Sequence, residues 1–281
     1  MLQEGDLALR TALELRAKLA ARGAEVLLTR EGPGSPPAPL HTLRPCAERL
    51  LRRIALEPRF SAIEARLAPG ERLRLHAAVA LFAVKKQSRF ESLRERARLA
   101  NRHRADLLLS IHFNASPFPT GERGPQEILA MVSGFHDASR LYNPFHRYRA
   151  LEKAFAIDDF DAAVHLGVGC VRAMSARLRI PVAREPRYED HLAVRDARGQ
   201  PVGVDAWDGA LLRYLDLPGV LTEGPSTNER EEMERLDAAL RTPLGTPGTR
   251  TDEYASALAS CVEEWAQRWL GSARNPFGTE P

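Results

Sequence analysis

The chain is poor in cysteine, with three in 281 residues. Cys46, Cys170 and Cys261 lie far apart, and no two of them form a C-x-x-C pair. This spacing argues against a cysteine zinc knuckle and against a dense disulfide framework. It allows one disulfide with a spare thiol, but it favours free buried thiols.

Long apolar runs and a strong charge surplus are also absent. No stretch of about 18 apolar residues occurs, so no membrane-spanning helix is expected. The 40 basic and 37 acidic residues leave a formal net charge of +3, which does not predict a nucleic-acid-binding surface. The first residues lack the basic region and apolar stretch of a signal peptide.

Motifs of several enzyme classes are missing as well. No G-x-S-x-G sequence marks a serine hydrolase, and no cysteine has an activating context. Neither a Walker sequence nor G-x-G-x-x-G marks a phosphate-binding loop. The chain is 44% hydrophobic, which is enough to bury one sizeable core.

The start of the chain predicts the fold class. Residues 6–22 carry apolar side chains at helical spacing and precede Gly23, so they predict a helix with a glycine C-cap. The apolar run at 25–29 predicts a buried strand directly afterwards. A helix followed by a strand is typical of α/β proteins, so we expect a mostly parallel sheet flanked by helices.

The rest of the chain predicts further elements and one insertion. Four prolines and two glycines at 31–40 predict a loop, and residues 43–84 predict a helical segment broken near Pro58 and Pro69. We interpret residues 33–88 as a helical insertion in a single domain spanning 1–281. The other expected elements are helices at 88–104, 161–178, 229–240 and 253–270, strands at 106–111 and 127–132, an apolar run at 211–222, and an aromatic-rich loop at 134–158.

His112 follows the apolar run at 106–111, where an open α/β sheet places reactive groups at the carboxyl ends of its strands. A histidine in this position is more often a hydrogen-bonded structural residue than a metal ligand. The surrounding sequence shifts this balance.

Several short motifs resemble, in order, those of the zinc-dependent N-acetylmuramoyl-L-alanine amidases. They are Leu-Thr-Arg at 28–30, Leu93 and Arg96, Ala100-Asn101, Ala105-Asp106, Ser110 to Asn114, and the run Leu217 to Glu223 followed by Asn228 and Glu231. The similarity runs from Glu4 to Leu236, interrupted at about 33–88 and by an enlarged region at about 134–210. It implies hydrolysis of the amide bond between N-acetylmuramic acid and L-alanine of peptidoglycan.

The resemblance also implies roles for individual residues. In this family zinc is held by two histidines and a glutamate, which match His112 and Glu4 here and leave the first histidine to a segment expected before Glu4. Glu223 matches the glutamate that handles protons, and Asn114 and Asn228 match substrate-binding positions. From position alone, Glu4 is an exposed carboxylate at a helix N-terminus and Glu223 a strand-end carboxylate capping a turn.

Two ligands leave a zinc site incomplete. We weighed His103, His165 and His191 as substitutes for the absent histidine and favour structural or exposed roles for all three. The alternative function is a degenerate amidase-like domain that binds cell-wall glycopeptide or a partner protein without catalysis. The family resemblance implies zinc, a peptidoglycan substrate, a protein activator and a place in the periplasm or cell envelope.

Overall fold

The computed structural model describes residues 3–32, 48, 52, 57–115, 126–134, 157–186, 191–207 and 209–273. The chain divides into an α/β unit, residues 1–33 and 100–281, and a helical unit, residues 34–99. The α/β unit carries a five-stranded sheet in the order β1-β5-β2-β4-β3. Its strands are β1 (Leu108–Asn114), β2 (Leu129–Ser133), β3 (Leu192–Arg195), β4 (Pro201–Trp207) and β5 (Gly219–Ser226).

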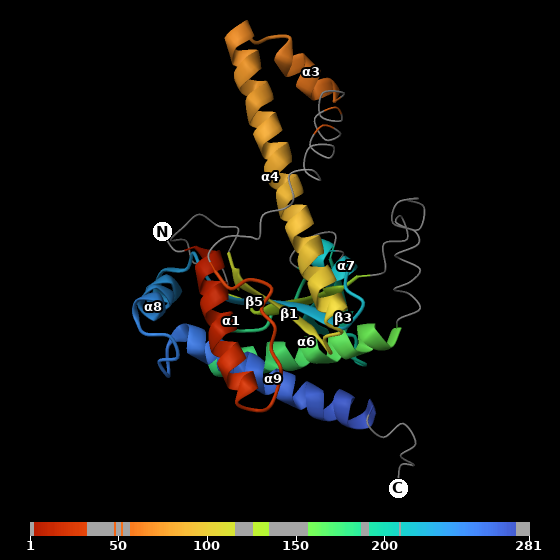
Figure 1. Ribbon diagram of the computed structural model, residues 1–281, viewed down its shortest axis with the longest axis vertical. Coiled ribbons are helices and arrows are strands. Elements are labelled where there is room, and N and C mark those ends of the chain that lie inside the picture. Colours follow the sequence, from red (N-terminus) through yellow and green to blue (C-terminus); the bar gives the residue numbers. More distant parts are fainter. Residues whose placement is uncertain are drawn as a thin grey trace. The chain divides into compact units, whose positions relative to one another are not determined.

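The sheet confirms the predicted α/β class. β1 pairs with β5 and β2 pairs with β4 in parallel, whereas β2/β5 and β3/β4 are antiparallel. The described helices that lie wholly in this unit are α1 (Glu4–Ala20), α6 (Ile157–Leu178), α7 (Ala210–Arg213), α8 (Arg230–Arg241) and α9 (Arg250–Ala273). α6 packs across β2, β4 and β5, and α9 packs against both α6 and α1 (Figure 1).

α1 forms where the apolar spacing predicted a helix. Leu7, Leu15 and Leu19 are buried and join the core of the α/β unit. The helix ends before Gly23, whose φ of +87° is the left-handed conformation that a glycine adopts at little cost. The C-cap itself is Ala21, so the predicted glycine lies two residues beyond the cap, where the chain turns away from the helix.

The strand predicted at 25–29 is wrong. Those residues are irregular in the structure, and Leu27 is 48% exposed. An apolar run becomes a strand only when a neighbour pairs with its backbone groups, and no described strand pairs with this segment. The helical start of the α/β unit leads instead through irregular chain.

The described part of the helical unit contains α3 (Pro58–Glu64) and the greater part of α4 (Pro69–Arg102). Pro58 is the first residue of α3 and Pro69 the first of α4, so both prolines stand where a helix start tolerates them. The predicted new helix start at residue 88 is wrong, because α4 is continuous over 34 residues. Residues 57–99 contribute no strand, and the predicted loops at 31–40 and 134–158 lie almost wholly outside the described residues.

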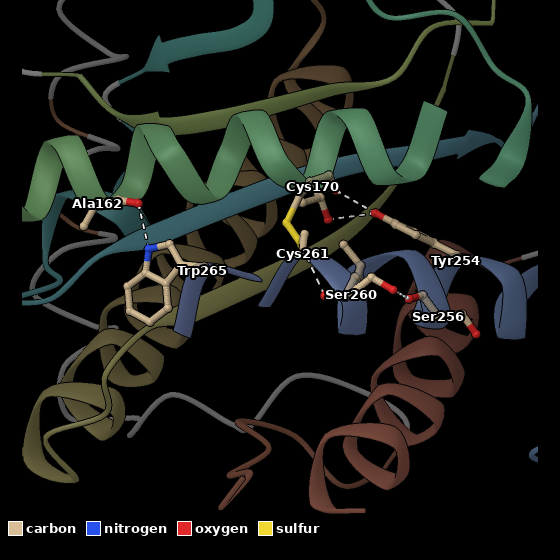
Figure 2. The surroundings of a disulfide bond; sticks show 9 residues. Ala162, Cys170, Tyr254, Ser256, Ser260, Cys261 and Trp265 are labelled. Atoms are coloured by element: carbon tan, nitrogen blue, oxygen red, sulfur yellow. Dashed lines mark hydrogen bonds between the residues drawn. A yellow bond between two sulfur atoms is a disulfide. The ribbon is translucent and has the colours of Figure 1, made fainter. Parts of the chain in front are cut away.

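A disulfide joins Cys170 on α6 to Cys261 on α9 (Figure 2). The expectation of free thiols at these two positions is therefore wrong, while Cys46 lies outside the described residues. The pairing could not be read from the sequence because the two cysteines are 91 residues apart and meet only when the two helices pack. One turn further along α9, the Trp265 indole donates to the carbonyl of Ala162 on α6 at 2.9 Å (Figure 2).

Candidate active site

The carboxyl ends of β1 and β5 bring two predicted site residues together. These strands are parallel neighbours, and their register pairs His112 with Glu223. Side chains alternate between the two faces along each strand, so residues at one register position of such a pair project from the same face. The sheet therefore places the His112 imidazole and the Glu223 carboxylate side by side.

Glu4 reaches the same place from the first turn of α1. Its Oε1 lies 2.7 Å from Nδ1 of His112, a contact between residues 108 positions apart. The Phe113 amide donates to the same oxygen at 3.4 Å. The Glu4 and His112 side chains are 47% and 32% exposed, so this contact is open to solvent.

Two arginines hold α1 in this position. The Arg30 guanidinium donates to the carbonyl of Gly5, directly after Glu4. Further along α1, Arg10 donates to the carbonyls of Thr242 and Pro243 at 2.9 and 2.8 Å, in the turn after α8. These contacts tie α1 to distant parts of the chain, and so help to fix where Glu4 lies.

Glu223 is half-buried within β5. β5 continues to Ser226, so Glu223 does not cap a turn at Gly224 and Pro225 as the alternative interpretation required. The register slips after Gly224, which pairs with Phe113, and leaves Pro225 without a partner on β1. A proline has no N–H to donate, which suits a bulge.

Tyr254 on α9 lies in the electrostatic field of both the Glu4 and the Glu223 carboxylate. Its side chain is fully buried, and burial raises its pKa well above the usual tyrosine value. The hydrogen bond with the Thr222 hydroxyl lowers that pKa in part, and the negative charges of Glu223 and Glu4 raise it. The same phenol therefore lies within electrostatic reach of both acidic residues of the candidate site.

The two asparagines expected to bind substrate both have partners within the chain. The side-chain amide of Asn114 donates to the backbone carbonyl of Glu127 at 2.9 Å. The backbone carbonyl of Asn114 accepts from the backbone amide of Thr227 at 2.7 Å. Asn228 accepts a hydrogen bond from the Ser226 hydroxyl at 2.7 Å. These contacts order the ends of β1 and β5, and a role in substrate binding stays a prediction for both residues.

Glu4 and His112 fit zinc in kind but not in number. Imidazole nitrogen and carboxylate oxygen are both ordinary zinc ligands, and a catalytic zinc site has three protein ligands plus an open position. Within the part of the chain that the structure describes, no group of three His, Cys, Asp or Glu residues is placed to hold a metal ion. The pair offers two side chains of the kinds that such a site uses, and their role as ligands stays a prediction.

The substitute histidines have other surroundings. His191 is buried, with Nδ1 3.2 Å from Oδ2 of Asp205 and its ring 5.5 Å from that of Trp207. His165 lies on α6 with its ring 6.3 Å from that of Trp269, and burial followed by the charge of Arg268 lowers its pKa. The third, His103, is exposed in the turn after α4.

The sequence model of the N-acetylmuramoyl-L-alanine amidases matches residues 61–239, more than half of the chain. The chain belongs to this family. Family membership supports peptidoglycan amidase activity in a cell-wall hydrolase. A search of curated protein sequences gave no match.

Solved structures of amidases share the fold. One is the N-acetylmuramyl-L-alanine amidase Ami1 from Mycobacterium smegmatis, with a TM-score of 0.51 and 18% identity over 96% of this chain and 78% of that one. Another is the amidase AmiC2 of Nostoc punctiforme, with a TM-score of 0.50 and 14% identity over 95% of this chain and 86% of that one. At identities this low, the structural likeness shows a shared fold and nothing more.

Sequence reasoning missed Tyr254 and Arg10 as parts of the site's support. Both lie on helices and follow ordinary helical spacing, so neither carries a local signal of its role. Arg30 lies within the Leu-Thr-Arg motif, which did mark it, but without any hint that its guanidinium reaches Gly5. These contacts arise from tertiary packing.

Proposed function

We propose that the chain hydrolyses the amide bond between the lactyl group of N-acetylmuramic acid and the L-alanine of the peptidoglycan stem peptide. The observation that carries this proposal is the 2.7 Å contact between Glu4 and His112 beside Glu223. An ordinary helix-start carboxylate has no need to meet a strand-end histidine. The family match, which begins at residue 61, does not itself include Glu4.

Glu4 and His112 would hold a zinc ion together with a third ligand outside this pair. When bound, zinc acidifies a water and polarises a carbonyl. Glu223 would accept the proton of the attacking water and return it to the departing amine of L-alanine. A half-buried carboxylate at the strand ends can accept a proton and give it back, so it can act first as base and then as acid.

Asn114 and Asn228 flank these groups at the strand ends and would orient the glycopeptide. Asn114 follows His112 by two residues on β1, and Asn228 lies just beyond β5. The helical insertion at about 33–88 and the enlarged region at about 134–210 stay predictions from the sequence. A protein activator stays an expectation from the family resemblance.

The site of action would be the periplasm or cell envelope, where the substrate is found. The Cys170–Cys261 disulfide supports this, because disulfides persist mainly in oxidising compartments. None of the described helices is long and apolar enough to cross a membrane.

A second candidate function is a domain that binds cell-wall glycopeptide or a protein partner without hydrolysis. The observation in its favour is that no group of three His, Cys, Asp or Glu residues is placed to hold a metal ion within the described ranges. The two functions differ in one measurable respect, which is whether the amide bond is broken.

The test compares the chain with Glu223→Gln and with the matched control Glu234→Gln, an exposed glutamate on α8. Each protein is supplied with zinc and dye-labelled peptidoglycan, and products are identified by mass spectrometry. Free stem peptides beginning with L-alanine are the expected products. Glu223→Gln should lower kcat/KM by about 100-fold or more, because the amide cannot accept the proton.

Zinc content should be unchanged in Glu223→Gln and reduced in His112→Ala. Hydrolysis by Glu223→Gln at the rate of Glu234→Gln would overturn the assignment of the base. Binding of peptidoglycan by the unmodified chain without any released peptide would establish the binding-only function instead.

A further inference from the structure

A buried tyrosine hydroxyl lies between the two strands that carry the candidate catalytic groups. Tyr254 is fully buried, and its hydroxyl lies 3.2 Å from the backbone carbonyl of His112 on β1. The same hydroxyl lies 3.2 Å from the carbonyl of Thr222 on β5 and 2.7 Å from the Thr222 hydroxyl. Thr222 directly precedes Glu223, so one oxygen atom contacts the backbone of both site-bearing strands.

The donors and acceptors of this cluster can be assigned. Carbonyl oxygens only accept, so the Tyr254 proton is directed at the carbonyls of His112 and Thr222. The Thr222 hydroxyl then donates to the phenol oxygen. The phenol is therefore a donor to both strands and an acceptor from Thr222.

The sheet makes room for this ring at the residues that follow His112 and Glu223. Phe113 meets the Tyr254 ring edge-on, with centroids 5.4 Å apart and an interplanar angle of 85°. At Gly224, an added Cβ would lie 2.4 Å from Cε1 and 2.6 Å from Cζ of Tyr254. Only a glycine leaves space for the ring at this position.

The Tyr254 hydroxyl ties β1 to β5 through the carbonyls of His112 and Thr222, and the place of this tie along the two strands suggests its role. The regular register between β1 and β5 ends between Phe113 and Asn114, one residue after His112. Beyond that point the strands are held less regularly, and the irregular part begins directly after the residues that carry the site. The Tyr254 hydroxyl joins the two strands just before the ladder loses its register.

We propose that Tyr254 is a positioning residue, which sets the separation of the His112 and Glu223 side chains by tying the backbone of His112 to that of Thr222. The proposal rests on the proposed amidase function of these two residues. Tyr254 does not touch substrate, because the strands cover its ring. Its effect on the reaction passes through the backbone.

The test compares Tyr254→Phe with the control Ser175→Ala. The first removes the hydroxyl and keeps the ring. The second removes a hydroxyl that donates to the carbonyl of Ile180 at 2.7 Å, at the end of α6. Tyr254→Phe loses contacts with two carbonyls and the Thr222 hydroxyl, whereas Ser175→Ala loses one hydrogen bond. Both should lower Tm, by about 2–4 °C for Ser175→Ala and by somewhat more for Tyr254→Phe.

Only Tyr254→Phe should alter catalysis. Its kcat, corrected for the folded fraction, should fall about 10- to 100-fold with KM within about two-fold, because misplaced groups slow the chemistry and leave binding intact. Thr222→Val keeps the hydrogen bond from Tyr254 to His112 but removes the hydroxyl that donates to the phenol. Its kcat should lie between those of Tyr254→Phe and Ser175→Ala. A kcat for Tyr254→Phe equal to that of Ser175→Ala would overturn the proposal.

A second readout separates this proposal from the proposed function. Amide hydrogen exchange at residues 110–114 and 222–226 should quicken at least about 10-fold in Tyr254→Phe and not in Ser175→Ala. If the unmodified chain hydrolyses no peptidoglycan, the proposed function fails, and this exchange still decides whether Tyr254 holds the strand ends. Unchanged exchange in Tyr254→Phe would reject the tie itself.

Discussion

The α/β unit and the helical unit use their apolar residues in different ways. In the α/β unit, buried side chains from α1, α6, α9 and the sheet form one continuous core. In residues 57–99, Ala97 is the one buried apolar side chain among those whose burial is described. Large apolar side chains of α4 lie open instead, with Leu73 73% and Phe82 59% exposed. The two units therefore differ in how much of their stability burial can supply.

Charge separates the two units as well. Residues 34–99 contain 14 basic and 6 acidic residues, whereas the rest of the chain contains 26 basic and 31 acidic residues. The small net charge of the whole chain is the sum of a basic helical unit and an acidic α/β unit. The comparison teaches that composition averaged over a chain does not describe either of its parts.

The first prediction concerns the disulfide that joins α6 to α9 in the α/β unit. Replacing Cys170 and Cys261 together by alanine should cost about 2–4 kcal/mol, because the bridge closes a long loop in the unfolded chain. Trp207, Trp265 and Trp269 all lie in the α/β unit, so urea unfolding followed by tryptophan fluorescence reports on that unit alone.

The same loss should appear when the unmodified chain is reduced, and reduction should not change the double variant. An unfolding midpoint unchanged by both treatments would show that the bridge does not stabilise the α/β unit. The difference in stability between the α/β unit and the helical unit would then come from the packing of apolar side chains alone.

The two regions also differ in how far their structure could be predicted. The sequence predicts α1, α6, α8 and α9 to within a few residues, because amphipathic spacing, glycine caps and acidic first turns are local signals. β3 and β4 were not predicted, although Asp196 and Gly199, with a φ of +76°, form the turn that joins them. β3 is short and partly exposed, so it lacks the apolar pattern of a core strand.

The candidate site was predictable where a resemblance supplied long-range information. Motif order indicated Glu4, His112 and Glu223, and the structure brings the first two into contact across 108 positions. Roles for these residues stay predictions. The Tyr254 hydroxyl and the Arg10 contacts depend on how α9 and the turn after α8 pack, which no local pattern encodes.

The second prediction tests the contact between α1 and α9 through its pH dependence. Lys18 lies 2.6 Å from Asp252, which also accepts from the Gly248 amide at 3.0 Å. Burial alone would raise the pKa of Asp252, but the hydrogen bonds from Lys18 and Gly248 and the charges of Lys18 and Arg177 lower it below its usual value. Asp252→Asn should therefore cost about 1–2 kcal/mol at pH 7.

That cost should fade in acid. A lowered pKa in the folded state stabilises the fold above the unfolded pKa of about 3.9, and this stabilisation is lost as pH falls through the folded value. Urea midpoints at pH 7, 5 and 3 should show a constant difference down to about pH 5 and a smaller one at pH 3. Asp237→Asn, in an exposed pair with Arg241, is the control and should change little. A difference that grows in acid would contradict the assignment.

The third prediction applies the comparison to leucines of the helical unit and has the smallest expected effect. Leu73→Ala and Leu81→Ala should each change stability by no more than about 0.5 kcal/mol, since both side chains are more than half exposed and alanine keeps the helix propensity of α4. The matched core substitution is Leu258→Ala on α9, where the side chain is fully buried and the cost should reach about 2–5 kcal/mol. Unfolding is followed by tryptophan fluorescence for the α/β unit and by circular dichroism at the helix band for both units. Leu73→Ala could instead lose helical signal at urea concentrations where the parent chain is intact. That result would mean that Leu73 is covered in solution, so that the helical unit also buries apolar side chains, but against a partner.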